Sequence, residues 1–225
     1  RSGMRFANMI QLQNLSGICF VLRYSDREKY YYETINNDRF IINPSELDVL
    51  MSYSTNNNKK VYSKIEFSNI TSFNEQFNEK KIYNRYEVDL NFRLSDQISA
   101  KISSEVKNTQ EDIGYIMEEN EEIYFGNRDL ESVENSIKIE YKIDSKKNIY
   151  LDFRNFWSKA GYSQILYKLN KDGYRELTDY SILNENPNTN FNLWNLDLNF
   201  EWWFAPGSNL VFLYRNQTHT HTHTH

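Results

Sequence analysis

The 225-residue sequence contains few of the residues that cross-link or interrupt a chain, with 7 Gly, 3 Pro and 1 Cys. Because Cys19 stands alone, neither an intrachain disulfide nor a cysteine-based zinc site can form. No stretch approaches the roughly 20 consecutive apolar residues that a transmembrane helix needs. The sequence also opens at Arg1 without a charged and then apolar leader. We therefore expect a piece of a longer protein rather than one with helical membrane spans.

The sequence also lacks an excess of positive charge, since 31 acidic residues against 26 basic ones give a net charge of −5. A basic surface of clustered Lys and Arg, which nucleic-acid binding requires, is therefore not expected, and we predict no nucleic-acid partner. All four His residues lie in the tail Thr218–His225, so a Ser-His-Asp triad has no general base. Neither a Gly-rich phosphate loop nor a Gly-x-Ser-x-Gly elbow occurs. We expect no catalysis and no cofactor.

What the sequence does have is aromatic residues, at 16% of the chain, and a strong two-residue periodicity. The aromatic content argues against disorder. Alternation of apolar and polar residues is typical of strands with one apolar and one polar face. Four apolar rows alternate with polar neighbours: Leu47, Val49, Met51 and Tyr53; Val61, Ile65 and Phe67; Tyr86, Val88, Leu90 and Phe92; and Ile137, Ile139 and Tyr141. The clearest row is Trp194, Leu196, Leu198, Phe200 and Trp202. These rows predict an all-β, antiparallel fold.

The connections between the predicted strands alternate in length. Short turns are predicted near Ser25–Glu28, Thr55–Lys59, Ser95–Gln97, Ser145–Lys147 and Ala205–Ser208. Long polar connections are predicted near Asn36–Ser45, Ile70–Lys80, Lys107–Ser132 and Ser158–Thr189. Outer-membrane barrels have short periplasmic turns and long extracellular loops, which produces this order along the chain. We therefore predict a partial transmembrane β-barrel of about ten strands in residues 1–217, too incomplete to close by itself.

In that interpretation the two faces of the sheet have different surroundings. Lumen-facing residues would be Arg85, Glu87, Asp89, Asn91, Arg93, Lys138, Glu140, Lys142, Asn195, Asp197, Asn199 and Glu201. Lipid-facing residues would be Tyr86, Val88, Leu90, Phe92, Ile137, Ile139, Tyr141, Trp194, Leu196, Leu198, Phe200 and Trp202. Charged residues remain hydrated in a water-filled lumen and can pair across strands. A soluble β-sandwich that binds glycans through its aromatics has the same periodicity and is the alternative, followed by a structural subunit of an outer-membrane assembly.

Three further patterns suggest chemistry, but each has a simpler explanation. The Thr-His repeat of residues 218–225 would place its imidazoles on one side of an extended chain and bind Ni²⁺ or Zn²⁺ adventitiously, but we expect it to lie outside the fold. The acidic run Glu118–Glu122 lacks the spacing of a calcium loop and is predicted to be a solvated loop. Carboxylates such as Glu87 and Asp89 recur with strand spacing, which favours lining a lumen over glycoside hydrolysis. We predict no metal site.

The last hundred residues resemble a known family. Glu122–Leu130 reads EIYFGNRDL and leads into SIKIEYKID, the turn SKKN and the strand IYLDFRNFW. The segment Phe200–Ser208, FEWWFAPGS, is the most specific part. This order is similar to the C-terminal barrel of outer-membrane proteins described as carbohydrate-binding family 9-like domain-containing proteins, a barrel catalogued as a domain of unknown function. The similarity extends from Arg39 to Gln217 and is strong from Glu122.

The resemblance implies a location in the outer membrane of a Gram-negative bacterium. It also implies an N-terminal domain of carbohydrate-binding type outside this chain, for which the barrel would serve as pore, substrate channel or anchor. The partners implied are the lipid bilayer, other outer-membrane subunits and glycans. It implies no reaction and no catalytic residues.

Overall fold

The computed structural model describes residues 2–30, 40–74, 79–178 and 188–223. Within these ranges the chain contains strands and no helix. No described helix could therefore cross a membrane. The strands are β1 (Gly3–Gln11), β2 (Gly17–Ser25), β3 (Glu28–Tyr30), β4 (Ile41–Asn43), β5 (Glu46–Ser54), β6 (Val61–Asn74), β7 (Glu79–Arg93), β8 (Ile98–Glu119), β9 (Glu122–Asp144), β10 (Lys147–Leu169), β11 (Arg175–Leu177), β12 (Thr189–Ala205) and β13 (Ser208–His223).

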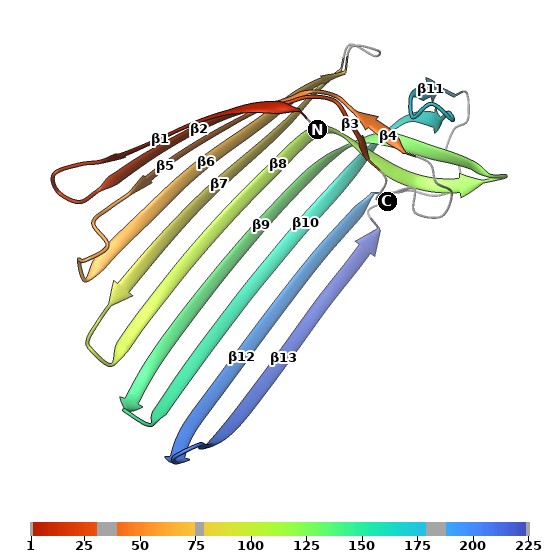
Figure 1. Cartoon of the computed structure of the whole chain (residues 1–225). Helices are drawn as coiled ribbons and strands as arrows, with labels where there is room; N and C mark the ends of the chain where they lie inside the picture. The colour runs from red at the N-terminus through yellow and green to blue at the C-terminus, as the bar shows by residue number, and fades with distance from the viewer. Residues whose placement is uncertain (1, 31–39, 75–78, 179–187, 224–225) are drawn as a thin grey trace.

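Ten of these strands form one antiparallel sheet in the order β1-β2-β5-β6-β7-β8-β9-β10-β12-β13 (Figure 1). β11 adds to β10, and β3 pairs with β4 in a separate two-stranded sheet. Among the described residues β1 and β13 are the edges of the long sheet and do not pair with each other. The prediction of an all-β antiparallel sheet of about ten strands is confirmed, and the sheet is open.

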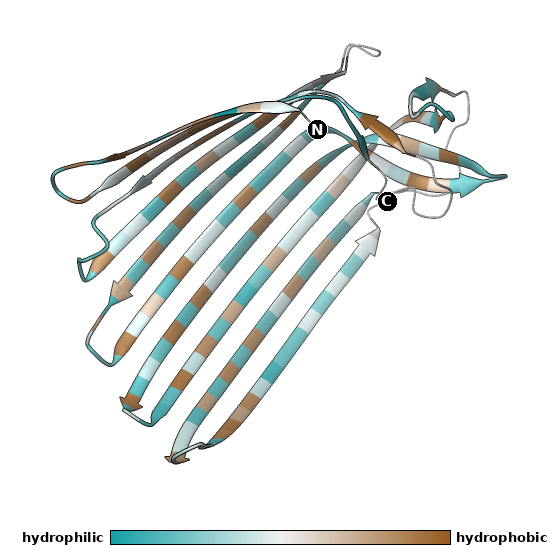
Figure 2. Ribbon diagram, viewed as in Figure 1, coloured by the Kyte–Doolittle hydropathy of each residue, from teal (hydrophilic) through white to brown (hydrophobic). Residues whose placement is uncertain are grey.

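The alternating sequence and the strand register together give the sheet two chemically different faces. Residues directly opposite one another on neighbouring strands share a face, because side chains alternate along each strand. Ile65 lies opposite Val88, and Lys64 lies opposite Asp89, so apolar residues meet apolar ones and charges meet charges. Coloured by hydropathy, the strands show this alternation as repeated bands (Figure 2). A one-residue slip would exchange the faces, so the pattern fixes the register.

All hairpins at one end of the sheet have short turns (Figure 1). Four of them fall where short turns were predicted, between β5 and β6, β7 and β8, β9 and β10, and β12 and β13. In the last, Pro206 precedes Gly207, whose φ of 76° suits the third position of a type II turn. The short turn predicted near Ser25–Glu28 is wrong, because β3 pairs with β4 instead of folding back on β2. The fifth short turn instead joins β1 to β2 at residues 12–16.

The long connections at the other end contain more strand than predicted. β8 and β9 continue through the predicted loop Lys107–Ser132 and meet in a two-residue turn at Asn120 and Glu121. Their φ values of 51° and 65° match the left-handed pair that a type I′ hairpin turn requires. β10 likewise continues into Ser158–Thr189 as far as Leu169, and β6 and β7 both enter Ile70–Lys80. Part of Ile70–Lys80, of Ser158–Thr189 and of Asn36–Ser45 lies outside the described residues.

Irregular pairing hides these strand extensions in the sequence pattern. The β8–β9 register shifts between Thr109 and Asp112 and again between Tyr115 and Met117, and the β9–β10 register shifts within Tyr162–Leu166. Each of the two β8–β9 bulges adds one unpaired residue to β8, so the two-residue period changes phase there. A search for unbroken alternation therefore ends where the first bulge begins.

The Thr-His repeat also differs from the expectation that it lies outside the fold. Residues 218–223 continue β13 and pair with β12 up to Thr189, which lies opposite His223. Thr is β-branched and favours strands, and a two-residue repeat fits the alternation of a strand. His219 and His221 lie on the same face, each with its ring near Phe191. Residues 224–225 are outside the described part.

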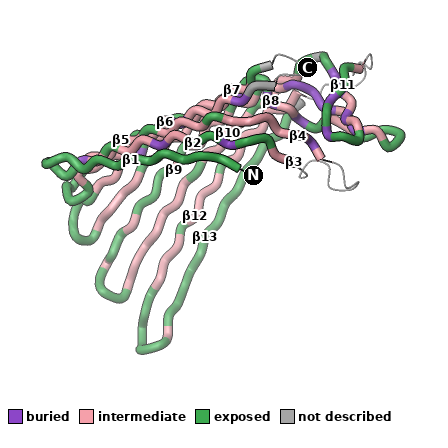
Figure 3. Tube along the Cα trace, turned by 45° about the horizontal axis from the view of Figure 1, so that its top comes forward, coloured by how far each residue is buried: buried purple, intermediate pink, exposed green. Residues whose placement is uncertain are grey.

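The strand extensions form the one region with an ordinary hydrophobic core among the described residues. Ile41, Ile123, Phe125 and Leu169 are buried together, and Ile113 packs against them. We call this region the extension. It consists of β4, β11, the part of β8 after residue 108, the part of β9 before residue 131 and the part of β10 after residue 159. It lies at the end of the sheet opposite the short turns, where many of the buried segments gather (Figure 3). The sheet itself is a single layer, since its strands contact mainly their hydrogen-bonded neighbours.

Candidate functional site

On the middle strands of the long sheet, the carboxylates of the polar face are less exposed than the apolar residues of the opposite face. On the polar face Asp89 is 8% exposed, whereas Tyr86 and Ile65 on the opposite face are 52% and 51% exposed. Water-soluble proteins bury apolar residues and leave ionised groups outside unless they are paired. Here basic side chains shield the carboxylates with which they pair, and among the described residues no second layer packs over the apolar face.

A transverse row of four glutamates crosses the polar face. Glu66, Glu87, Glu105 and Glu134 lie directly opposite one another on β6, β7, β8 and β9. Like charges at opposite positions repel one another. Arg85 offsets this repulsion, because its guanidinium donates to Glu66 at 2.6 Å and also contacts Glu87 and Glu105.

Three of these glutamates also pair with a cation of their own, whereas Glu87 pairs with Arg85 alone among the described residues. Lys64 lies 2.7 Å from Glu66, Lys107 pairs with Glu105, and Arg154 lies 2.8 Å from Glu134. The remaining polar-face pairs are Arg23 with Asp48, Lys101 with Asp89, Lys138 with Asp152, Lys142 with Glu140, and Arg215 with Asp197. The face is thus a lattice of alternating charges that runs across most of the sheet.

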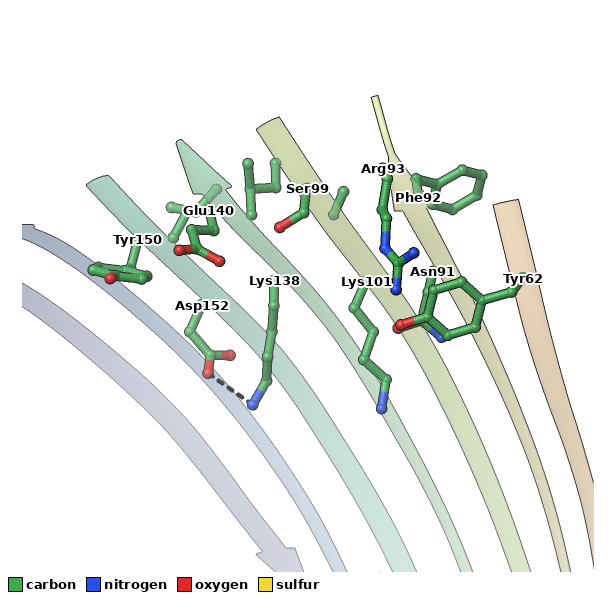
Figure 4. Close-up of a pocket in the computed structure, with 13 residues that line it drawn as sticks. Tyr62, Asn91, Phe92, Arg93, Ser99, Lys101, Lys138, Glu140, Tyr150 and Asp152 are labelled. Carbon is green, nitrogen blue, oxygen red and sulfur yellow. Dashed lines mark ion pairs between the residues drawn. The ribbon is translucent and has the colours of Figure 1, made fainter. Parts of the chain in front are cut away.

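Between the row of glutamates and the short turns lies an open hollow of about 410 Å³, which we call the polar hollow. One row of its lining crosses five strands in register: Tyr62, Asn91, Lys101, Lys138 and Asp152. The next row towards the turns contains Arg93, Ser99, Glu140 and Tyr150. Figure 4 shows these side chains rising from the same side of the sheet, with Lys138 joined to Asp152.

The opposite face carries an apolar band. Its rows begin near the short turns with Ile98, Tyr141, Ile149, Phe200 and Phe212 and end with Phe67, Tyr86, Val106, Val133 and Trp157. Polar residues inside the band are hydrogen-bonded, as when Ser104 Oγ donates to Asn135 Oδ1 at 2.8 Å. The next row is polar on six strands: Asn69, Asn84, Asn108, Glu131, Lys159 and Asn190. The apolar band therefore stops abruptly before the extension.

The extension has a polar cluster of its own, centred on Arg128. Its Nε donates to Asp112 at 2.9 Å and its Nη1 donates to the Tyr162 hydroxyl at 2.9 Å, while Lys81 lies 2.6 Å from Asp112. Burial lowers the pKa of Arg128, but Tyr162 and Asp112 together raise it above its ordinary value. A Cβ at Gly114 would come within 2.5 Å of the Arg128 guanidinium, so a side chain at this position would displace Arg128.

The structure brings together all of the residues that were predicted to share a face. The strand register places the twelve residues predicted to face a lumen on the polar face, and the twelve predicted to face lipid on the apolar face. Sequence reasoning missed several members of the charge lattice: Lys101, Glu105, Lys107, Glu134, Asp152, Arg154 and Arg215. A two-residue period runs through KISSEVK and LDFRNF and could have identified most of them, although the serines weaken the contrast.

Within the described ranges, no group of three or more His, Cys, Asp or Glu side chains is placed to hold a metal ion. The carboxylates Glu87 and Asp89, considered above for glycoside hydrolysis, are bonded to Arg85 and to Lys101 respectively.

These features define a class of protein: a single-layer, all-antiparallel β-sheet with one charged and one apolar face. The chain belongs to the family described as a domain of unknown function (DUF5916), whose model matches residues 2–225. This match includes both the first forty residues and the Thr-His repeat, and so is wider than the resemblance seen in the sequence. Comparison with the curated proteins and with the solved structures gave no match.

Proposed function

We propose that the long sheet forms part of the wall of a transmembrane β-barrel in the outer membrane of a Gram-negative bacterium. In this proposal the apolar band faces lipid and the charge lattice lines a water-filled interior. The exposed apolar face, lying opposite a face of shielded carboxylates, is the observation that carries it. A soluble β-sandwich would have to cover the apolar face with a second sheet, and no such layer occurs in the part of the chain that the structure describes.

The height of the apolar band supports a bilayer as its environment. From Val133 to Tyr141 the band covers about nine residues of β9, and a tilted membrane-spanning strand needs about 9–11. The aromatic residues Trp157 and Tyr141 lie in its two end rows, as the interfacial girdles of barrels would require. The polar row that follows would then lie at the level of the headgroups.

The two ends of the sheet fit the asymmetry of such barrels. Five short turns lie at one end and would face the periplasm, while the extension lies at the other and would project outward. Lipid supplies no hydrogen-bond partners, so the edges β1 and β13 must pair with further strands in the membrane. The proposed role is therefore that of a barrel segment that forms a pore or substrate channel, or anchors another domain, without catalysis.

The experiment compares the purified full chain in detergent micelles, in phosphatidylcholine vesicles and in buffer without detergent. We expect strand-rich circular dichroism in micelles and vesicles, flotation with the vesicles after a high-salt wash, and aggregation in plain buffer. A chain that stays folded and monomeric in plain buffer and remains below the floating vesicles would contradict the proposal. That result would instead favour the soluble glycan-binding module.

A further inference from the structure

We propose that the polar hollow binds a small anionic solute through the guanidinium of Arg93 and the ammonium groups of Lys101 and Lys138. This inference rests on the proposed function only in requiring that water and solutes reach the polar face. It adds a ligand class that the barrel proposal leaves open.

Arg93 differs from the cations of the charge lattice because it has no carboxylate partner among the described residues. Arg23, Arg85, Arg128, Arg154 and Arg215 each contact at least one carboxylate. The Arg93 guanidinium instead lies over the ring of Tyr62, 5.3 Å from its centroid. This contact positions the charged group and leaves its N–H donors available. A planar guanidinium with free donors suits a carboxylate or a phosphate, which it can bind with two parallel hydrogen bonds.

The two lysines beside Arg93 add a second reason to expect an anion. Lys101 and Lys138 occupy directly opposite positions on β8 and β9, an arrangement in which like charges destabilise a sheet. Their ammonium groups turn to different carboxylates, Lys101 to Asp89 at 2.9 Å and Lys138 to Asp152 at 3.2 Å. In Figure 4 their ammonium groups lie apart, on either side of β9. An anion bound near both lysines would reduce their mutual repulsion.

The local charge count agrees with this assignment. Three cations, Arg93, Lys101 and Lys138, line the hollow together with only two carboxylates, Glu140 and Asp152. Glu140 lies 3.5 Å from Lys142, and Asp152 is paired with Lys138, so neither carboxylate neutralises Arg93. The glutamate row, by contrast, has a cation within contact of every carboxylate. Of the three cations that line the hollow, Arg93 is therefore the one without a carboxylate partner among the described residues.

The size and lining of the hollow indicate more closely which class of anion it would bind. A volume of about 410 Å³ is in the range of small-molecule sites. Tyr62 and Tyr150 lie at its two sides, on β6 and β10, and Asn91 and Ser99 lie between them. Aromatic rings with hydroxyl and amide groups suit a polyhydroxylated solute. The structure thus points to a sugar that carries a carboxylate or a phosphate.

The test titrates the full chain in detergent micelles at low ionic strength. The four ligands are glucuronate, glucose 6-phosphate, inorganic phosphate and glucose, and binding is measured by calorimetry or saturation-transfer NMR. We expect one or more of the three anions to bind at least tenfold more tightly than glucose, because a charge-assisted bidentate contact is worth about a factor of ten or more. Preference for glucuronate identifies a carboxylated ligand, and preference for either phosphate a phosphorylated one. Equal binding of glucose and the anions, or no binding at all, overturns the proposal.

Matched variants connect the binding to the hollow. Arg93→Gln should weaken anion binding about tenfold. Arg93→Lys should weaken it less, because the positive charge remains although the paired N–H donors of the planar guanidinium are lost. Arg215→Gln, which removes an already paired arginine of the same face, should leave binding unchanged. Equal losses in Arg93→Gln and Arg215→Gln would overturn the assignment. Lys138→Gln, at an exposed position, gives a second test should Arg93→Gln fail to fold. Because micelles suffice for all these measurements, their result is separate from that of vesicle insertion.

Discussion

The apolar band and the extension obey opposite rules of burial although the same strands build both. On β9, Phe125 in the extension is fully buried, whereas Ile139 in the band is 36% exposed. The extension collects its apolar side chains in a small core, as a protein in water does. The band leaves its apolar side chains exposed, and no second layer covers them in the described part of the chain. One strand therefore passes through two environments, and the change occurs at the polar row that contains Asn108 and Glu131.

The largest expected effect comes from the extension. Phe125→Ala removes a fully buried ring and should cost about 3–5 kcal/mol of local stability. Hydrogen exchange in vesicles should show that amides of residues 110–130 lose protection while those of residues 133–141 keep theirs. Phe212→Ala, at an exposed ring in the band, is the matched control and should change protection little. Equal losses in the two variants would show that the regions are not distinct.

The next effect tests the apolar band. Ile137→Arg places a charge in the middle row of the band and should cost about 2–4 kcal/mol in vesicles if that row lies near the bilayer midplane. Ser136→Arg, one residue away on the polar face, should cost far less because the side chain would remain in water. The measurement is the free energy of unfolding by guanidinium in vesicles. Comparable costs for the two variants would mean that both faces contact the same medium.

A smaller effect is expected for the charge lattice. Arg85→Gln leaves three glutamates without their shared cation and should cost about 1–3 kcal/mol. Arg215→Gln removes one exposed pair with Asp197, for which about 0–1 kcal/mol is expected. The same unfolding assay compares them, and a larger loss for Arg215→Gln would contradict the role given to Arg85.

The smallest effect concerns the short-turn end. Asp144 accepts a hydrogen bond from the backbone N–H of Lys146 at 2.8 Å, which lowers the pKa of this carboxyl below its usual 3.8. A lowered folded-state pKa contributes stability above the unfolded pKa, and this contribution is lost as the pH falls through the folded value. Asp144→Asn should therefore be slightly less stable at pH 7 and lose this difference below about pH 3.8. Unfolding midpoints at the two pH values measure it, and a constant difference would rule out the ionised carboxylate as its source.

The sequence predicts the band well and the extension poorly, for one physical reason. Where each face has a single environment, as at Tyr86 and Glu87, side chains must alternate, and the pattern shows the strand, its face and its register. In the extension, bulges at Thr109 and Tyr115 shift the phase, and the core of Phe125 and Leu169 depends on contacts between distant strands. Those contacts have no local signature. The sequence predicts part of the polar hollow, because it places Arg93 and Lys138 on the polar face. That Arg93 has no carboxylate partner among the described residues is evident only from the structure.

The most direct test of the two-faced sheet uses neighbouring residues of one strand. In a Cys19→Ser background, Lys138→Cys and Ile139→Cys are each labelled with an environment-sensitive fluorophore, and the full chain is reconstituted in vesicles. The account predicts blue-shifted emission, quenched by brominated lipid, for the label at position 139, and water-like emission for the label at position 138. Water-like emission from both labels, or lipid quenching of both, would contradict it.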